Sequence, residues 1–430
     1  MALTGRFVLL VLLGIVPVLL RPDLDTVWLW LLLVVVIGLV DLALSPRITA
    51  LGFERAAVGQ VRQGAATTTT LLVTNLGRRR IRARVRDAWQ PTAGATGNRH
   101  RIGLGPQESD RLVSALCPVR RGDLRAVGVT ARISGPLGLV SRQRTVPVPG
   151  SVRSLPPFES RKHLPSRLAR LRELDGRAAI RVRGQGTEFD SLREYVRGDD
   201  VRSIDWRASA RNRNVVVRTW QPERDRRVVL VLDTSRTSAG RVQDVPRLDA
   251  AMDAALLLAA LAARAGDRVD FVAGDRRVRS RLRLAAQPGV ALALQDAMSD
   301  LQPIIAEADW ATLAGAIQGL GRQRALVVLL TPLEPAAVES GLLPVLPTLT
   351  RHHRVVLASV RDPALESMAR REEDGTDAYD AAAAEQSIAS RNRTSDLLGA
   401  LGVDVLDRDA ESLPPALADH YLMLKARGLL

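Results

Sequence analysis

The sequence contains one cysteine, Cys117, so no disulfide can form within the chain. This excludes a small disulfide-stapled fold and is typical of a reducing compartment. Lysine is scarce: Lys162 and Lys425 are the two present, so the formal net charge of +15 at pH 7 comes almost wholly from arginine. The histidines are scattered apart from His352 and His353, and no cysteine–histidine spacing is typical of a zinc site.

Aromatic residues make up 3% of the chain, and no zinc module or aromatic stacking motif for nucleic acid is present. A phosphate-binding loop ending in Gly-Lys-Ser or Gly-Lys-Thr is also missing, so the chain is not expected to hydrolyse nucleotides by itself. The arginine excess therefore favours a lipid bilayer or an acidic protein as partner over nucleic acid or a small-molecule substrate.

Two long apolar runs lie near the N-terminus. Residues 7–20 carry no charge, and residues 27–44 carry a single one, Asp41. The second run approaches the ~20 apolar residues of a spanning helix, and Trp28 and Trp30 stand where an interfacial belt belongs. Because no cleavage motif follows the first run, the two runs predict an uncleaved membrane hairpin of two transmembrane helices.

The charges that flank this hairpin, residues 1–46, predict its orientation. The connecting turn sets Arg21 against two aspartates, whereas an excess of arginine follows the second run, namely Arg47, Arg55, Arg62, Arg78, Arg79 and Arg80. The positive-inside rule then predicts a multi-pass protein of the cell membrane with cytoplasmic soluble domains. Asp41 lies near the cytoplasmic end, where we expect its carboxylate to reach water and to serve a structural role.

Residues 47–157 have the pattern of short antiparallel strands. Apolar and polar residues alternate over 67–75, 81–89 and 124–133, and glycine, asparagine and proline separate these segments. Half-buried strands at this spacing predict a small β-sandwich.

Residues 227–430 instead alternate strand-like and helix-like segments. Continuous apolar runs over 228–232, 269–273, 325–331 and 354–360 predict buried strands, and 248–264, 313–320 and 413–424 predict helices. The alternation predicts a doubly wound α/β sheet and, with the hairpin and sandwich, an α+β multidomain protein. Residues 370–386 are acidic and then alanine-rich, typical of a helix-bearing insertion or a partly disordered one.

Between these domains, residues 158–226 contain a charged segment without a clean helical or strand period. Its carboxylates alternate with arginines, which predicts a network of charge-assisted hydrogen bonds that fixes an irregular loop. Its recurring elements are Glu-Phe at 188–189, Leu-Arg-Glu-Tyr at 192–195, Gly-Asp-Asp at 198–200, Ile-Asp-Trp at 204–206 and Ser-Ala-Arg at 209–211. This ordered set resembles the signature of the bacterial family called domain of unknown function 58.

The resemblance implies a von Willebrand factor A-like α/β domain after the signature. Asp233, Ser235 and Thr237 follow the first apolar strand, and they resemble the metal-ion-dependent adhesion site of such domains, which holds Mg²⁺. The later acid of that pattern is replaced by proline, leaving Glu334 as the nearest substitute, and Thr312 is the candidate for the intermediate threonine. The alternative is a metal-free turn in which Asp233 caps the following chain.

The resemblance also implies a function. Proteins similar to this chain are thought to work with MoxR-type AAA+ ATPases in assembling or activating client proteins. This predicts a non-enzymatic, membrane-bound adaptor that presents its α/β domain to the ATPase and client. The alternatives are a membrane-surface enzyme, for which no nucleophile–base pair is indicated, and an anionic-lipid-binding scaffold without an ATPase partner.

Overall fold

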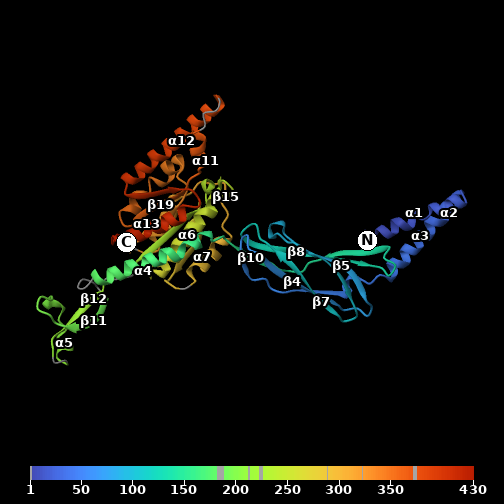
Figure 1. Ribbon diagram of the computed structural model, residues 1–430, viewed down its shortest axis with the longest axis horizontal. Helices are drawn as coiled ribbons and strands as arrows, with labels where there is room; N and C mark the ends of the chain where they lie inside the picture. Colours follow the sequence, from blue (N-terminus) through green and yellow to red (C-terminus); the bar gives the residue numbers. More distant parts are fainter. Residues whose placement is uncertain are drawn as a thin grey trace. The chain divides into compact units, whose positions relative to one another are not determined.

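The computed structural model describes residues 2–181, 188–211, 214–221, 226–287, 289–321, 323–370 and 375–430. The chain forms two compact units, Met1–Leu155 and Pro156–Leu430, which are described separately below (Figure 1). It is a mixed α/β protein with an apolar N-terminal helix and several sheets.

The first unit begins with an apolar helical hairpin. Helices α1 (Gly5–Leu12) and α2 (Ile15–Leu20) lie beside α3 (Leu24–Leu44) (Figure 1). One helix, Leu24–Ala50, is long and apolar enough to cross a membrane by length and composition, and Gly5–Leu20 is a shorter apolar segment.

Glycine permits the close contact between the two arms of this hairpin. A Cβ atom on Gly14 would lie 2.4 Å from Nε1 of Trp30, and one on Gly38 would lie 3.2 Å from the ring of Phe7. Small residues allow apolar helices to approach closely in this way. Trp30, which the sequence suggested for an interfacial belt, therefore packs against the first arm.

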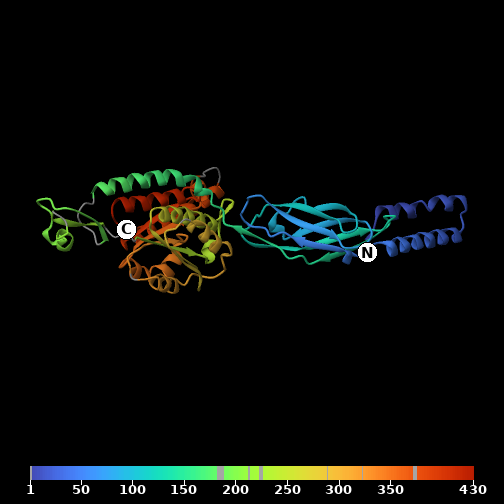
Figure 2. The ribbon, with the colours of Figure 1, turned by 90° about the horizontal axis from the view of Figure 1, so that it is seen from below.

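The remainder of the first unit is a two-sheet sandwich (Figure 2). Its strands are β1 (Ala2–Leu3), β2 (Leu51–Arg55), β3 (Gln60–Arg62), β4 (Thr67–Asn75), β5 (Ile81–Trp89), β6 (Arg99–Leu104), β7 (Ser109–Leu116), β8 (Gly122–Ser134), β9 (Val140–Val146) and β10 (Ser151–Leu155). Strands β2, β4 and β7 form the smaller sheet, and the others form the larger one. Alternate residues of β4 and β5, including Leu71, Val73 and Val85, face the shared core, which confirms the predicted antiparallel strands.

Asp41 joins the hairpin to the sandwich. Its carboxylate is fully buried and accepts hydrogen bonds from the backbone N–H groups of Leu137 (2.8 Å), Leu139 (2.8 Å) and Val140 (2.9 Å) in the β8–β9 turn. The expectation that this carboxylate reaches water is therefore wrong, because the turn covers it. Its structural role is confirmed, since a buried carboxylate is tolerated when such donors surround it.

The second unit is built on a six-stranded sheet in the order β17-β16-β13-β18-β19-β20, in which β17 is antiparallel to its neighbour. Its strands are β13 (Arg227–Asp233), β16 (Arg268–Gly274), β17 (Val278–Leu284), β18 (Leu326–Leu330), β19 (Arg354–Val360) and β20 (Val403–Arg408). Every residue of β13 is buried, which confirms the continuous apolar strand predicted there. A short β14–β15 pair (Arg241–Val242 and Val245–Pro246) follows β13.

Helices cover both faces of this sheet (Figures 1 and 2). The helices of this unit include α4 (Leu164–Arg181), α6 (Arg247–Arg264), α7 (Val290–Ser299), α8 (Trp310–Gln318), α9 (Pro335–Ala337), α10 (Leu346–Thr350), α11 (Ala364–Ala369), α12 (Gly375–Ala400) and α13 (Leu413–Ala426). Residues of α6, α7 and α13 form one core with Leu230 and Leu232 of β13, whereas α8 and α10 pack on Val229 and Val231 of the opposite face. The three predicted helices are confirmed within a few residues at each end.

The charged segment forms a β-hairpin of its own within the second unit. Strand β11 (Glu188–Glu194) pairs antiparallel with β12 (Val216–Gln221), and the short helix α5 (Trp206–Ser209) lies between them in sequence. The expectation of an irregular loop is thus wrong for the two flanking strands.

Candidate functional site

The order of the strands identifies where a ligand would bind in the α/β unit. From β13 the chain builds outward to β16 and β17, then crosses back to the other side of β13 to form β18, β19 and β20. In open α/β sheets, ligands bind beyond the carboxyl ends of the strands at such a reversal. Asp233 ends β13, and Thr331 directly follows β18, so both side chains lie at this point.

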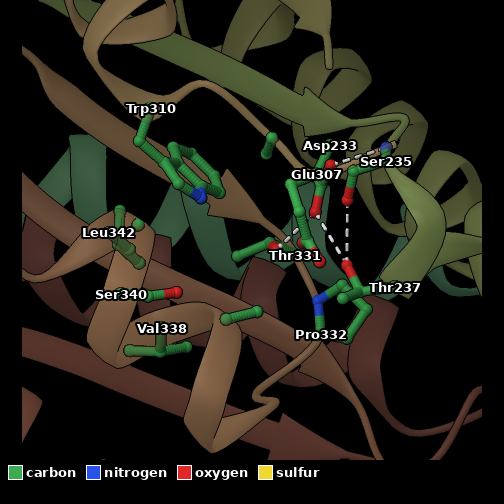
Figure 3. Close-up of a pocket in the computed structure, with 13 residues that line it drawn as sticks. Asp233, Ser235, Thr237, Glu307, Trp310, Thr331, Pro332, Val338, Ser340 and Leu342 are labelled. Carbon is green, nitrogen blue, oxygen red and sulfur yellow. Dashed lines mark hydrogen bonds between the residues drawn. The ribbon is translucent and has the colours of Figure 1, made fainter. Parts of the chain in front are cut away.

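A cavity of about 210 Å³ opens at this position (Figure 3). Its polar side is formed by the loop after β13, with Asp233, Ser235 and Thr237. Trp310 and Leu342 contribute an apolar wall, and further lining comes from Glu307, Ala308, Thr331, Pro332, Ala337, Val338, Ser340 and Gly341. Asp233, Ser235 and Thr237, which the sequence pattern grouped, line this cavity together.

Hydroxyl groups surround the carboxylate of Asp233 (Figure 3). Its Oδ2 accepts hydrogen bonds from Oγ1 of Thr331 (2.7 Å) and Oγ1 of Thr237 (3.2 Å), and its Oδ1 accepts one from the backbone N–H of Ser235 (2.7 Å). The hydroxyls of Ser235 and Thr237 are 3.0 Å apart. The bond from the N–H of Ser235 is the capping contact expected for a metal-free turn.

Burial dominates the electrostatics of this carboxylate. Asp233 is 0% exposed, and its desolvation raises the pKa above the ordinary value, while the hydrogen bonds from Ser235, Thr331 and Thr237 act in the opposite direction. Among the described residues no cation pairs with Asp233. A cation entering the pocket would therefore offset a desolvated negative charge.

The oxygen atoms of Asp233, Ser235 and Thr237 are of the kind that a hard cation binds, but only Asp233 can carry a formal charge. Among the described residues, no group of three or more His, Cys, Asp or Glu side chains is arranged to hold a metal ion. Asp233, Ser235 and Thr237 nevertheless present oxygen donors within hydrogen-bonding distance of one another. Mg²⁺ accepts such a set, because it is often bound through one or two carboxylates and retains several waters.

The two additional candidates, Thr312 and Glu334, lie outside the residues that line this cavity. Thr312 donates its hydroxyl to Asp309 (2.6 Å) at the N-terminus of α8, where Asp309 is the cap. Glu334 accepts a hydrogen bond from Nη1 of Arg247 (2.9 Å) and lies 3.8 Å from Nη1 of Arg391. Both side chains therefore have structural partners of their own.

Sequence reasoning missed Thr331 and Glu307. Thr331 could have been found, since it follows the strand that lies next to β13 in a sheet of this order. Glu307 comes from an irregular loop without periodicity, and it accepts a hydrogen bond from Nε of Arg236. The sequence pattern gives no indication that this loop lines the pocket.

The β11–β12 hairpin contains the predicted charge network. Arg193 donates two hydrogen bonds to Asp199 (2.6 and 2.8 Å), and this pairing lowers the pKa of Asp199. Asp205 instead pairs with Arg218 (2.8 Å) and caps α5 through the backbone N–H groups of Arg207 and Ala208. Several apolar side chains of this segment are exposed, namely Leu192, Val196, Val201, Trp206 and Val215.

The fold is α/β, with a cavity at the reversal point of a mostly parallel sheet. Residues 191–381 match the profile of the family described as "Protein of unknown function DUF58". The match begins in β11 and ends in α12, so it includes both the hairpin and the pocket. A comparison with curated proteins finds no match.

Several solved structures share local similarity with the chain. A conserved hypothetical protein BatB from Bacteroides thetaiotaomicron is 12% identical, with 47% of this chain and 99% of that one covered and a TM-score of 0.29. The PapD-like domain 7 of human CEP192 is 12% identical over 25% of this chain and 86% of that one, with a TM-score of 0.19. The CARDB domain of the PF1109 protein from Pyrococcus furiosus is 18% identical over 24% and 87%, with a TM-score of 0.18. Scores this low do not define a fold.

Proposed function

We propose that the protein is a membrane-anchored, non-enzymatic adaptor that presents its α/β unit to a MoxR-type AAA+ ATPase and its client proteins. The observation that carries the proposal is a buried carboxylate, Asp233, ringed by hydroxyls beside an open cavity at the reversal point of the sheet. Such an arrangement suits the recognition of a charged group on a partner. The exposed apolar residues of the β11–β12 hairpin offer a second contact surface on the same unit.

The topology supports a relationship with von Willebrand factor A domains. The sheet has parallel strands with one antiparallel edge strand, and an Asp-x-Ser-x-Thr sequence follows β13 at the reversal point. In this proposal Asp233, Ser235 and Thr237 hold a Mg²⁺ ion, with Thr331 supporting the carboxylate. The ion, when bound, would supply an open coordination position for a carboxylate of the partner protein.

The hairpin supports a two-pass anchor. Its two arms are antiparallel neighbours, and both of its ends contact the same turn of the sandwich, through Thr4 at one end and Asp41 at the other. A pair of transmembrane helices that begins and ends on the same side of the membrane requires this arrangement. The arginine-rich sequence after the second arm then favours the cytoplasm for the soluble units.

Affinity purification of the full-length protein from cross-linked native membranes tests the adaptor role. We expect an AAA+ ATPase among the leading partners, and we expect Asp233→Asn to lower its recovery roughly tenfold, as for loss of a charge-assisted contact of about 1.5 kcal/mol.

The matched control is Asp309→Asn, which changes a carboxylate outside the lining of the pocket and retains a good helix cap. Equal recovery from wild type and both variants would remove the pocket from the proposal. Repeated absence of an ATPase from wild-type purifications would remove the adaptor role itself.

A further inference from the structure

The outer face of the large sheet in the sandwich carries arginines in register. On β5, Arg82, Arg84 and Arg86 point outward, because Ile81, Ala83 and Val85 alternate with them into the core. Register places Arg84 directly between Arg101 of β6 and Arg132 of β8.

Neighbouring rows continue this pattern. Arg86 faces Arg99 on β6, and Arg78, Arg79 and Arg80 are exposed just before β5 begins. Like charges directly opposite one another in a sheet repel, so each such pair is a local cost to folding.

Among the described residues of the first unit, no salt bridge offsets this repulsion. Within residues 2–155, none of the arginines at 82, 84, 86, 99, 101 and 132 forms a salt bridge. The positions in register beside these arginines on β5, β6, β8 and β9 carry Ala88, Gly103, Gly128, Thr130, Ser134, Ser141, Gln143 and Thr145, none of which is acidic. Asp123, at the opposite end of β8, pairs with Arg153. Binding of an external polyanion would therefore relieve the repulsion between these arginines.

The same face adjoins the base of the apolar hairpin. Arg132 donates a hydrogen bond from Nη2 to the carbonyl of Leu3 (3.0 Å), and Gly135, three residues further along, would place a Cβ 2.3 Å from Oδ1 of Asp41. At about 3.4 Å per residue, the row of Arg84 lies within about 10 Å of the hairpin base along the strand, and the row of Arg86 within about 17 Å. An anionic membrane attracts basic groups over about one Debye length, roughly 8 Å at physiological salt.

We propose that Arg78, Arg79, Arg80, Arg82, Arg84, Arg101 and Arg132, the arginine face, bind the anionic head groups of the lipid leaflet at which the hairpin inserts. The proposal rests on the membrane anchoring proposed above. Seven guanidinium groups fall within the range of roughly four to eight basic residues typical of anionic-lipid contacts. Guanidinium forks also match phosphate oxygens in geometry.

Arginine footprinting in nanodiscs tests this contact without altering the protein. Full-length protein is placed in discs of phosphatidylcholine alone or with phosphatidylglycerol, and phenylglyoxal modification of each arginine is followed by mass spectrometry. We expect phosphatidylglycerol to slow modification of Arg84 and Arg101 at least about threefold, and to slow Arg86 and Arg99 by less than about 1.5-fold. Salt at ~0.5 M should abolish the difference.

Two double variants provide a matched comparison on the same pair of strands. Arg84→Gln/Arg101→Gln should reduce phosphatidylglycerol retained by the purified protein, whereas Arg86→Gln/Arg99→Gln should leave it near the wild-type amount. Neither should lower the melting temperature, since each removes a repelling pair. Equal retention in both variants overturns the proposal.

The remaining outcomes distinguish a failure of lipid binding by the arginine face from a failure of the proposed membrane anchor. Protein that enters the discs but shows no lipid-dependent protection overturns lipid binding and leaves the anchor intact. Protein that cannot be incorporated overturns both. Protection by millimolar inorganic phosphate in phosphatidylcholine discs would identify a free-phosphate site, and stronger protection by a single-stranded oligonucleotide would identify a nucleic-acid surface. Either result would overturn the proposal that lipid head groups are the ligand of the arginine face.

Discussion

Asp233 is the residue whose ionisation should control the pocket. Burial raises its pKa, so the protonated carboxyl is favoured in the folded state. The stabilisation from this group is fully present below the unfolded pKa of about 3.9 and is lost as pH rises through the raised folded value. Mg²⁺ requires the ionised form, so the ion should stabilise the protein increasingly as pH rises through that value.

Thermal denaturation with and without millimolar Mg²⁺ measures this coupling. We expect Mg²⁺ to raise the melting temperature of wild type at pH 8 by a few degrees and to have little effect at pH 4. Asp233→Asn should lose the Mg²⁺ response while melting no lower than wild type without metal, because it removes a buried charge. An equal Mg²⁺ response in this variant would show that the ion binds elsewhere.

A second pH-sensitive residue, Asp253, holds the segment that leads into the α/β unit. Ser160 donates to its carboxylate from the hydroxyl (2.8 Å to Oδ1) and from the backbone N–H (3.1 Å to Oδ2). Burial raises the pKa of Asp253 to about 6, with Ser160 and Lys162 opposing the shift and Glu159 adding to it. The stabilisation from this group is present below about pH 4 and lost as pH rises through about 6.

Asp253→Asn isolates this contribution. The free energy of unfolding of wild type, measured by urea titration, should fall relative to that of Asp253→Asn as pH rises from 4 to 7. Ser160→Ala should cost about 1.5 kcal/mol at pH 7, because a bond to an ionised acceptor is lost. Parallel pH profiles for wild type and Asp253→Asn would contradict the assignment.

The residues of the pocket show which parts of the candidate site could be predicted from the sequence. Asp233, Ser235 and Thr237 were predictable as a group, because a polar cluster directly after an apolar strand falls at a sheet edge. Thr312 and Glu334 were placed by pattern, which cannot reveal that helix capping and ion pairs occupy their side chains. Glu307 depended on a loop whose path is set by tertiary contacts.

At the scale of elements, the joint between α3 and the β8–β9 turn is the most specific feature of the first unit. Asp41→Ala would leave three backbone N–H groups of the turn without their acceptor. We expect a cost of about 3 kcal/mol or more, since each unsatisfied buried donor costs about 1–3 kcal/mol. Limited proteolysis in native membranes should then cut between residues 135 and 140, where wild type resists.

Asp25→Ala is the control for this joint, because Asp25 lies in the first turn of the same helix and is exposed. The hairpin should remain in the membrane fraction in both variants, so cleavage reports on the turn alone. If Asp41→Ala resists protease as wild type does, the turn does not depend on this carboxylate.

Elements with one strong periodicity were predictable, and those with a mixed pattern were not. Strands β4, β5 and β13 follow alternating or continuous apolar sequence and match their predicted positions. Strands β11 and β12 carry charges on both sides of the pattern, and Leu192 of β11 and Val215, which precedes β12, are exposed. Burial therefore leaves no periodic signal in this segment. Asn214, just before β12, donates a hydrogen bond to Glu194 at the end of β11.

At the scale of the whole molecule, each of the two units has hydrophobic cores of its own. The two cores of the sandwich contain residues between Ile48 and Val152, and the two cores of the α/β unit contain residues between Phe158 and Leu430. Since burial of apolar surface is the main stabilising contribution to folding, each unit has its own source of stability.

The α/β unit is therefore expected to fold without residues 1–155. A fragment of residues 156–430 should remain soluble and unfold in one cooperative transition, at the temperature of the corresponding transition in the full-length protein, as followed by calorimetry. It should also retain the Mg²⁺ response that depends on Asp233, because every residue lining the cavity belongs to this unit. The complementary fragment, residues 1–155, should stay in the membrane fraction after carbonate extraction. A soluble fragment 156–430 that lacks a cooperative transition would show that the α/β unit draws stability from residues 1–155, and that its own cores are not sufficient to stabilise it.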